Sequence, residues 1–262
     1  MLWHEKTWTR ISAIDKRIPV LIPLGSCEQH GPHLPLFVDT LQVSTIADKA
    51  EKKLADRVLL LPTLWLGSSH HHMDFPGTIS LLPSLYSQVI QSLATCVLEA
   101  GFRRLFFLNG HGGNQTPVSQ ALSELVCAND LADDAYLVLS TWWDLGKGKL
   151  DEGMKTREIS HACEYETSLM MAIRPDLVSM DRISEGPMAL DNEWIKTENL
   201  AAGRVSLFRR FRRLTASGSM GLPSAASPEK GRNILEVITQ EVVHFVTDFA
   251  GWPDLPPIGP RD

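Results

Sequence analysis

Residues 25–40 read GSCEQHGPHLPLFVDT, and they follow an apolar run at 18–24 whose length and β-branched content are typical of a buried strand. In an extended segment, side chains two positions apart project to the same side, so Glu28 and His30 can reach one point in space. Two prolines exclude a helix here and stiffen the loop that leads to Asp39, whose two carboxylate oxygens could bridge two cations. The segment therefore predicts a metal site just beyond the end of a buried strand.

These three candidate ligands form a mixed nitrogen and oxygen set. Imidazole and carboxylate together suit zinc, manganese or iron and suit calcium poorly. Each residue alone is more often a surface or capping group, but their proximity in the sequence favours a metal site. Two interpretations of His33 stay open: it supports the metal ligands, or it is an ordinary loop residue. Cys27 is not expected to be a nucleophile, because neighbouring carboxylates disfavour its thiolate.

Composition limits the class of protein. With 262 residues, 44% of them hydrophobic, the chain can fill a substantial core, and we expect one domain over 1–262. Lys plus Arg number 25 and Asp plus Glu 31, a net charge of −6 that argues against general nucleic-acid binding. No run of about 18 apolar residues and no signal core occurs, so we expect a soluble cytoplasmic protein that does not bind membranes. The four scattered cysteines form no C-x-x-C motif and are expected to be buried free thiols.

Strand and helix patterns alternate along the chain. The expected strands are 18–24, 58–62, 105–108 and 135–140, and the expected helices are 41–56, 84–100, 116–128 and 228–249. The last helix has a clear start, a serine followed by proline and glutamate. Strand–helix–strand units form parallel sheets flanked by helices, with active sites at the carboxyl ends of the strands. The opening segment lies at such an end.

Three later segments also follow expected strands. Residues 67–78 contain three adjacent histidines, of which we assign His72 to the substrate or to support of the metal ligands. Residues 109–114 read NGHGGN, where His111 is the one side chain able to bind a transition metal firmly and the glycines let a ligand approach. A phosphate-binding turn is the alternative, but neither G-x-G-x-x-G nor G-x-x-x-x-G-K-[ST] is present. Trp143 is assigned to a pocket wall, although paired tryptophans more often cover a core.

A further helix begins near residue 160 and contains candidate site residues. If all are helical, His161 and Glu166 lie about 140° apart around the axis, so spacing favours Glu164 as the partner of His161. The alternative is that His161 precedes the helix and Glu166 lies on its first turn. Residues 208–213, FRRFRR, are interpreted as a solvated charged face rather than a contact for an anionic substrate or another subunit.

Four motifs occur in a fixed order: GSCEQHGPHLP with Asp39, FPGT at 75–78, NGHGGN at 109–114 and HACEYETS at 161–168. Together they resemble the creatininase (creatinine amidohydrolase) family over nearly the whole chain. The resemblance implies an α/β fold of three-layer α/β/α type with a mostly parallel central sheet. It also implies two divalent metal ions per subunit and a homohexamer built as a trimer of dimers.

The resemblance further implies a role for individual residues. Two metal positions would share one aspartate: Glu28, Asp39 and His111 at the first, and His30, Asp39 and Glu166 at the second. His161 resembles the catalytic histidine of the family. The resemblance thus favours Glu166 over the Glu164 that spacing prefers.

The chain departs from creatinine hydrolases proper in one motif. Those enzymes carry Tyr-Glu after the motif histidine, whereas Gly112 and Gly113 follow His111 here. They also place a substrate-enclosing tryptophan shortly before the catalytic histidine, where this chain has Arg157. Creatinine is therefore not the expected substrate. Branches that keep the Gly-Gly form hydrolyse formamides, sugar-like lactone or ketone rings, or peptide bonds in a peptide-derived cofactor pathway, and we assign both glycines to substrate binding.

We expect metal-dependent hydrolysis of a non-protein carbon–nitrogen bond in a small amide, a cyclic amide or formamide included. Two cations bridged by Asp39, zinc first with manganese or iron as alternatives, would activate a water, and His161 would protonate the leaving nitrogen. A peptidase acting on a short peptide or a peptide-derived cofactor precursor is one alternative. A non-catalytic metal-binding protein is another, and the presence of every matched ligand weighs against it.

Overall fold

The computed structural model describes residues 1–156, 159–186, 193–194, 205 and 207–255, so Arg157 lies outside the described residues. Its sheet consists of β2 (Leu59–Leu60), β1 (Val20–Leu24), β3 (Arg104–Asn109) and β4 (Tyr136–Thr141) in that spatial order. All three pairings are parallel. The expected parallel sheet is confirmed, with the second strand shorter than the apolar run that predicted it.

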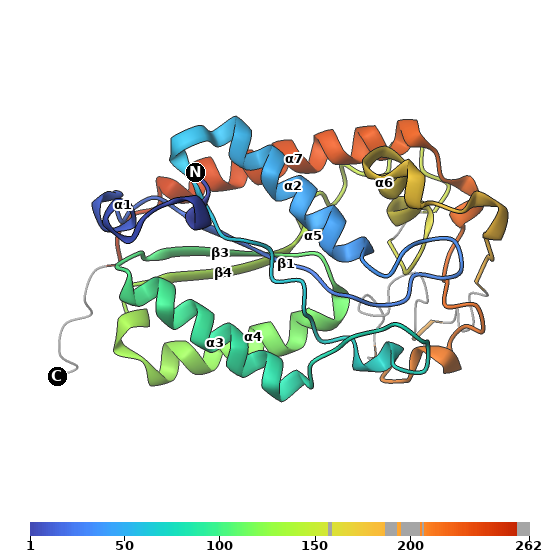
Figure 1. The fold of residues 1–262 in the computed structure, drawn as a ribbon, viewed down its shortest axis with the longest axis horizontal. Coiled ribbons are helices and arrows are strands. Elements are labelled where there is room, and N and C mark those ends of the chain that lie inside the picture. The colour runs from blue at the N-terminus through green and yellow to red at the C-terminus, as the bar shows by residue number, and fades with distance from the viewer. Residues whose placement is uncertain (157–158, 187–192, 195–204, 206, 256–262) are drawn as a thin grey trace.

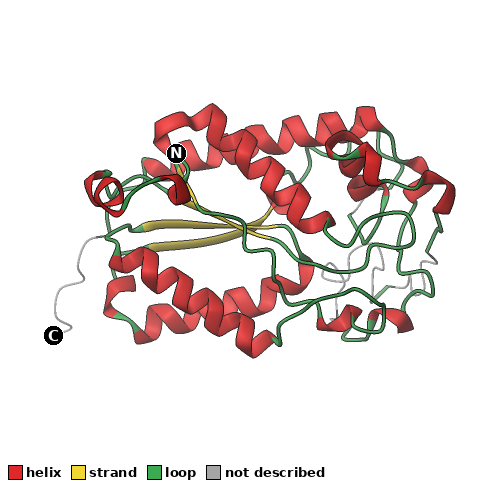
Figure 2. Ribbon diagram, in the orientation of Figure 1, coloured by secondary structure: helices red, strands yellow, loops and turns green. Residues whose placement is uncertain are grey.

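Helices cover both faces of this sheet (Figures 1 and 2). On one face lie α2 (Val38–Leu54), α6 (Glu164–Ile173) and α7 (Pro228–Ala250), which pack against one another. On the other lie α3 (Pro83–Glu99) and α4 (Gln115–Ala128), while the short α1 (Trp8–Ala13) and α5 (Trp142–Leu145) sit at opposite ends of the strands. The three-layer α/β/α arrangement is therefore confirmed.

The core consists of two apolar clusters, one on each side of the sheet. Along β1, Leu21 points into the cluster shared with α2 and α7, whereas Ile22 points into the cluster shared with α3 and α4. Phe106 and Phe107 divide in the same way along β3. Because both faces are covered, these strands need apolar side chains at every position, which explains their unbroken hydrophobic runs.

The start of α7 follows the sequence signal. The Ser227 side chain accepts a hydrogen bond from the Lys230 backbone N–H at 3.2 Å, and Pro228 occupies the first helical position. Ile238 and Val242 on its apolar face are fully buried against the sheet side of the core. Among the described helices, none is long and apolar enough to cross a membrane.

The cysteines are only partly as expected. All four are free thiols, and Cys27 and Cys163 are buried. Cys96 and Cys127 are exposed, so the expectation that they are buried is wrong. They lie on the solvent-facing sides of α3 and α4, where apolar neighbours in the sequence do not mean apolar neighbours in space.

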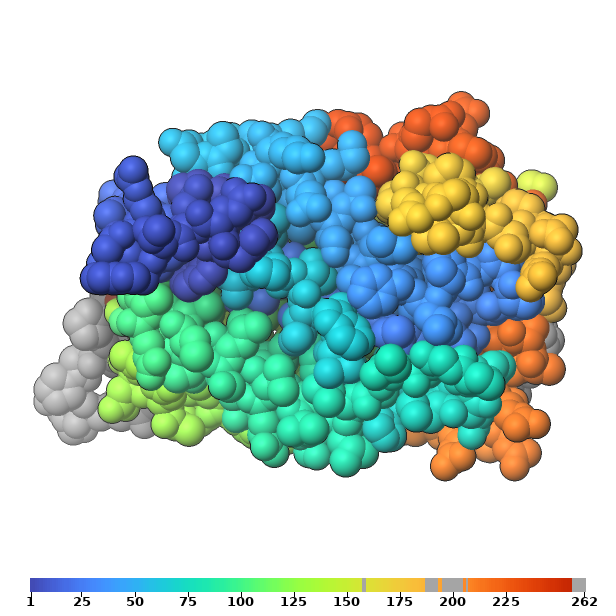
Figure 3. Space-filling model, in the orientation of Figure 1, coloured from blue at the N-terminus to red at the C-terminus, as the bar shows by residue number. Residues whose placement is uncertain are grey.

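The carboxyl ends of the strands all point away from α1, and the long loops collect at that end (Figure 1). Figure 3 shows the blue segment after β1, the teal segment around η3 (His70–His72) and the orange segment around η8 (Phe211–Arg213) meeting there. Helices η3 and η8 contact each other directly. The fold thus brings the candidate site residues to one end of the molecule.

Candidate metal centre

Side chains from four separate elements meet beyond the strand ends. Glu28 and His30 lie in the loop after β1, Asp39 lies on the first turn of α2, and His111 follows β3. Glu166 joins them from the first turn of α6. All five are buried, although each is polar or charged. The structure therefore brings together every metal ligand that the sequence predicted.

Asp39 is at the centre of this group. Its Oδ1 lies 3.1 Å from Nε2 of His30, and its Oδ2 lies 3.1 Å from Nδ1 of His111. The remaining carboxylates face the same two rings, because Glu166 Oε1 is 3.8 Å from His30 Nε2 and Glu28 Oε1 is 3.3 Å from His111 Nδ1. Each oxygen of Asp39 thus faces a different imidazole, as a bridging carboxylate requires.

Both imidazoles are oriented by backbone carbonyls. Nδ1–H of His30 donates to the Glu28 carbonyl at 3.1 Å, and Nε2–H of His111 donates to the Ser68 carbonyl at 3.1 Å. When each ring is neutral, the nitrogen that faces the carboxylates carries its lone pair. This is the arrangement usually found around metal-binding histidines.

The charge of the cluster fits a cation. Three buried carboxylates meet here. Among the described residues they form no ion pair with Lys or Arg, and Glu28 Oε2 has no hydrogen-bond partner. Burial alone lowers the pKa of His30 and of His111, but the adjacent carboxylates outweigh it, raising the pKa of His30 well above its usual value and that of His111 to about 10. Protonated imidazoles thus supply the positive charge that divalent ions would supply. Oxygen and nitrogen donors together fit zinc, manganese or iron.

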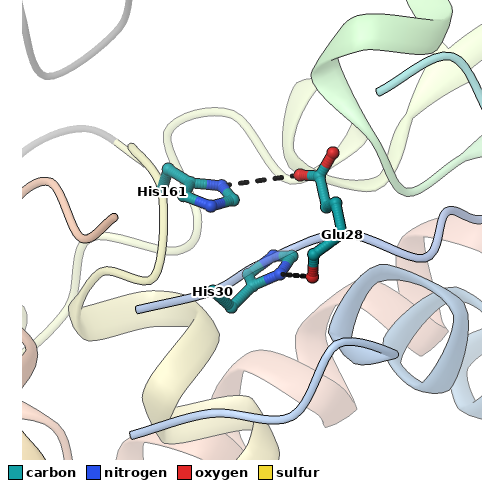
Figure 4. Close-up of side chains that lie close together, drawn as sticks. All are labelled: Glu28, His30 and His161. Atoms are coloured by element: carbon teal, nitrogen blue, oxygen red, sulfur yellow. Dashed lines mark hydrogen bonds and ion pairs between the residues drawn. The ribbon is translucent and has the colours of Figure 1, made fainter. Parts of the chain in front are cut away.

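His161 lies in the loop before α6 and faces the same cluster (Figure 4). Its Nε2–H donates to the Gln29 carbonyl at 2.7 Å. Nδ1 is therefore the unprotonated nitrogen of the neutral ring, and it lies 3.6 Å from Glu28 Oε1. The ring centre lies 4.3 Å from that of His30. Burial, followed by the charge on His30, lowers the pKa of His161 to about 3, so the ring is neutral. A neutral imidazole with an inward-facing lone pair can accept a proton there.

The backbone after His161 is in an unusual conformation. Ala162 has φ of 51°, in the left-handed region that favours glycine, and its N–H donates to Glu166 Oε2 at 2.5 Å. This turn ends the loop and lets α6 begin at Glu164. His161 therefore precedes the helix and Glu166 lies on its first turn, which is the alternative that spacing left open.

Glu164 and Glu166 point in different directions. The Glu164 carboxylate accepts backbone N–H groups from Lys155 at 3.0 Å and Thr156 at 2.8 Å, and it pairs with the Lys230 ammonium. Glu166 faces His30 instead. Spacing along an ideal helix therefore favoured the glutamate that points away from the cluster, because His161 lies before the helix.

Several residues surround the cluster. His72 is buried, with Nδ1 2.8 Å from the Gln29 amide nitrogen and Nε2 3.5 Å from Glu28 Oε1. The Gln29 amide also donates to the Gly218 carbonyl at 3.1 Å, and the Phe211 ring lies 4.2 Å from His72 and 4.6 Å from His161. Sequence reasoning missed Gln29 and Phe211, since neither is a metal ligand or a common acid–base group.

The remaining residues that the sequence assigned to the substrate or to support of the metal ligands have different surroundings. A Cβ added at Gly112 would meet no atom within 4 Å, so there is open space above it, whereas one at Gly113 would lie 2.4 Å from His111 Nε2. Trp143 packs against Trp142 and the apolar core on the α7 side, and its assignment to the substrate stays a prediction. His33 donates or accepts through Nε2 with the Thr167 hydroxyl at 2.9 Å, which places it beside the α6 start.

Comparisons with known proteins agree with this geometry. The family model described as creatinine amidohydrolase matches residues 4–246. A creatinine amidohydrolase of Pseudomonas putida is 30% identical over 265 residues, covering 93% of this chain and 95% of that one. A mycofactocin precursor peptide peptidase of Mycobacterium ulcerans (strain Agy99) is 30% identical over 248 residues, covering 90% and 87%. A crystal structure of creatinine amidohydrolase superposes with a TM-score of 0.81 at 26% identity, covering 96% and 98%, and other solved creatininases are described as manganese and zinc–zinc forms.

Proposed function

The chain belongs to the creatininase family of hydrolases, and we propose that it hydrolyses a carbon–nitrogen bond of a small non-protein amide, cyclic amide or formamide. The observation that carries the proposal is the meeting of three carboxylates and two oriented imidazoles in one buried cluster, with His161 beside it. Such a cluster is costly to bury unless cations occupy it.

We propose that two divalent ions, zinc first and manganese or iron as alternatives, occupy this cluster. Glu28, Asp39 and His111 would hold one, and His30, Asp39 and Glu166 the other. The second set is supported by donor atoms that all lie within 4.8 Å of one another. When bound, the ions supply Lewis acidity, which activates a water and polarises the carbonyl that it attacks.

His161 carries the proton in this scheme. Its Nε2–H is held by the Gln29 carbonyl, so proton transfer occurs at Nδ1. Because the ring is neutral, Nδ1 first accepts the proton that the attacking water loses and then donates it to the leaving nitrogen as the carbon–nitrogen bond breaks. The products are a carboxylic acid and an amine, and no redox partner is needed.

The surroundings support a small substrate. His72 and the open space at Gly112 are proposed to bind it, together with Gly113 and Trp143. The Phe211 ring contacts both His72 and His161, so it limits the access of bulk water to the ring that is proposed to transfer the proton. Creatinine is not the proposed substrate, because Gly112 and Gly113 replace the Tyr-Glu pair of creatinine hydrolases proper.

A short-peptide peptidase is the second candidate, and the mycofactocin precursor peptide peptidases among the relatives favour it. A 3-dehydro-scyllo-inosose hydrolase of Thermotoga maritima, 28% identical over 167 residues, shows that ring substrates occur among relatives too. A screen of cyclic amides, formamides and dipeptides with zinc or manganese added separates these classes by which substrates turn over.

The test of metal dependence uses two aspartates of the same helix. Asp39→Ala should abolish zinc uptake and turnover together, whereas Asp48→Ala, at an exposed position of α2, should change neither. Full turnover by metal-free Asp39→Ala protein would refute the proposal. A wild-type protein that binds zinc but turns over no substrate class would instead support the non-catalytic alternative. The homohexamer and the cytoplasmic location stay predictions, and light scattering of the purified protein tests the first.

A further inference from the structure

The three adjacent histidines of η3 have three different environments. His70 is exposed, and its Nδ1 lies 3.0 Å from the Ser80 hydroxyl. His72 is buried against Gln29. His71 lies between them, half-buried, and makes no hydrogen bond with the described residues. An imidazole without a hydrogen-bond partner, half-buried beside a metal centre, is a candidate ligand.

The position of His71 fits that role. One of its ring nitrogens, a nitrogen of His111 and an oxygen of Glu28 all lie within 4.8 Å of one another. Three donors of one zinc ion, each about 2.1 Å from it, lie about 3.4 Å apart in a tetrahedral arrangement. Donor pairs at the 4.8 Å limit would therefore have to close by about 1.4 Å for all three atoms to bind one ion. The rings of His71 and His111 lie with their centres 5.7 Å apart and their planes at 11°.

Gly113 makes this approach possible. A Cβ at this position would lie 2.4 Å from His111 Nε2, 2.4 Å from the Ser68 carbonyl oxygen and 2.7 Å from His71 Cε1, distances that real Cβ contacts essentially never show. Any side chain at residue 113 would therefore displace at least one of the two rings or the Ser68 carbonyl that holds His111. The glycine thus leaves space that His71 partly fills.

We propose that His71 is a further ligand of the metal position formed by Glu28, Asp39 and His111, and that Gly113 is required for it. This inference rests on the proposed function, since it needs a metal at that position. A second imidazole makes this position richer in nitrogen than the one formed by His30, Asp39 and Glu166. Imidazole donors suit zinc and iron, whereas carboxylate sets suit manganese, so the first position should prefer zinc.

Zinc titration of the metal-free protein against a chromophoric chelator tests the proposal without measuring turnover. His71→Ala should lower the affinity for one of the two bound zinc ions at least about tenfold, because losing even a residue that hydrogen-bonds to a ligand lowers metal affinity about 10–100-fold. Gly113→Ala should weaken the same equivalent. His70→Ala is the matched control, since it removes the same side chain from the same turn and should change neither equivalent. In cobalt-loaded protein, His71→Ala should alter the visible absorption bands and His70→Ala should not.

The outcomes are distinguishable. If His71→Ala and the milder His71→Gln both bind two zinc equivalents as tightly as the wild type does, His71 is not a ligand. That result would leave the hydrolase proposal intact. A wild-type protein that binds no zinc would overturn both. If His71→Ala fails to fold, as circular dichroism would show, His71→Gln decides.

Discussion

Changing either of two glutamates on one turn of α6 to glutamine should impair a different property of the protein. The Glu164 carboxylate has no exposed surface and is bound by Lys155 N–H, by the N–H and hydroxyl of Thr156, and by the Lys230 ammonium. Glu166 faces His30 and Asp39, and it accepts a hydrogen bond from one backbone N–H, that of Ala162. We therefore expect Glu164→Gln to lower the stability of the metal-free protein, and Glu166→Gln to lower its affinity for metal.

The magnitudes follow from these contacts. Breaking a buried ion pair by removing one partner costs about 3–5 kcal/mol, and glutamine keeps one acceptor, so about 3 kcal/mol is expected for Glu164→Gln. Burial raises the pKa of Glu166 despite its contact with His30, which means that its charge is poorly accommodated without a cation. A neutral amide at that position should change metal-free stability by less than about 1 kcal/mol.

Urea unfolding, with chelator and with zinc, measures both effects. Zinc at 100 times its dissociation constant should stabilise the wild type and Glu164→Gln by about 2.7 kcal/mol, and this increment should shrink in Glu166→Gln. Burial alone raises the pKa of Glu164, but Lys230 and the N–H donors outweigh it and lower the pKa below 4.5. The stability that Glu164 contributes is thus present above pH 4.5 and is lost as pH falls through its folded pKa, so the penalty of Glu164→Gln should narrow in acid. Equal effects of the two variants on metal-free stability would refute this reasoning.

Three further predictions concern residues around the cluster. Gln29→Leu removes the amide beside His72 and should lower kcat up to about 100-fold without changing the zinc content. Steady-state kinetics and metal analysis measure the two quantities. An unaltered kcat would contradict the role of Gln29 in positioning His72. Burial, followed by the charge on His30, lowers the pKa of His33 to about 4, so the folded state loses on the order of 3 kcal/mol as pH falls from about 6.5 to 4. In urea titrations across this range, His33→Gln should flatten that slope. Phe211→Ala should cost about 3–5 kcal/mol and speed zinc uptake in stopped-flow measurements, and unchanged uptake would mean that the ring does not cover the site.

The layered fold could be predicted because its signals are local. Apolar runs such as the one containing Leu21 and Ile22 alternate with amphipathic helical patterns, and that order permits few arrangements other than a parallel sheet with helices on both faces. The start of α7 at Pro228 was equally clear. The exposed Cys96 shows the limit of such reasoning, since an apolar neighbourhood in sequence does not determine which side of a helix faces solvent.

The meeting of Glu28, Asp39 and His111 could be predicted because loops after parallel strands meet at one edge, whereas Glu166 was implied by the family resemblance. Choosing between Glu164 and Glu166 was beyond spacing rules, because the 100° step per residue holds only inside a helix and His161 lies before α6. The roles of Gln29 and His71 depend on long-range contacts, to Gly218 and to His111, that leave no periodic pattern.

The left-handed turn at Ala162 has a practical consequence for anyone seeking a thermostable form of this enzyme. Glycine adopts such a backbone freely, and an L-residue there costs about 1–2 kcal/mol, so Ala162→Gly would relieve backbone strain. The same exchange would loosen the backbone beside His161, the residue that we propose transfers the proton. Heat tolerance and turnover are therefore expected to move in opposite directions in Ala162→Gly.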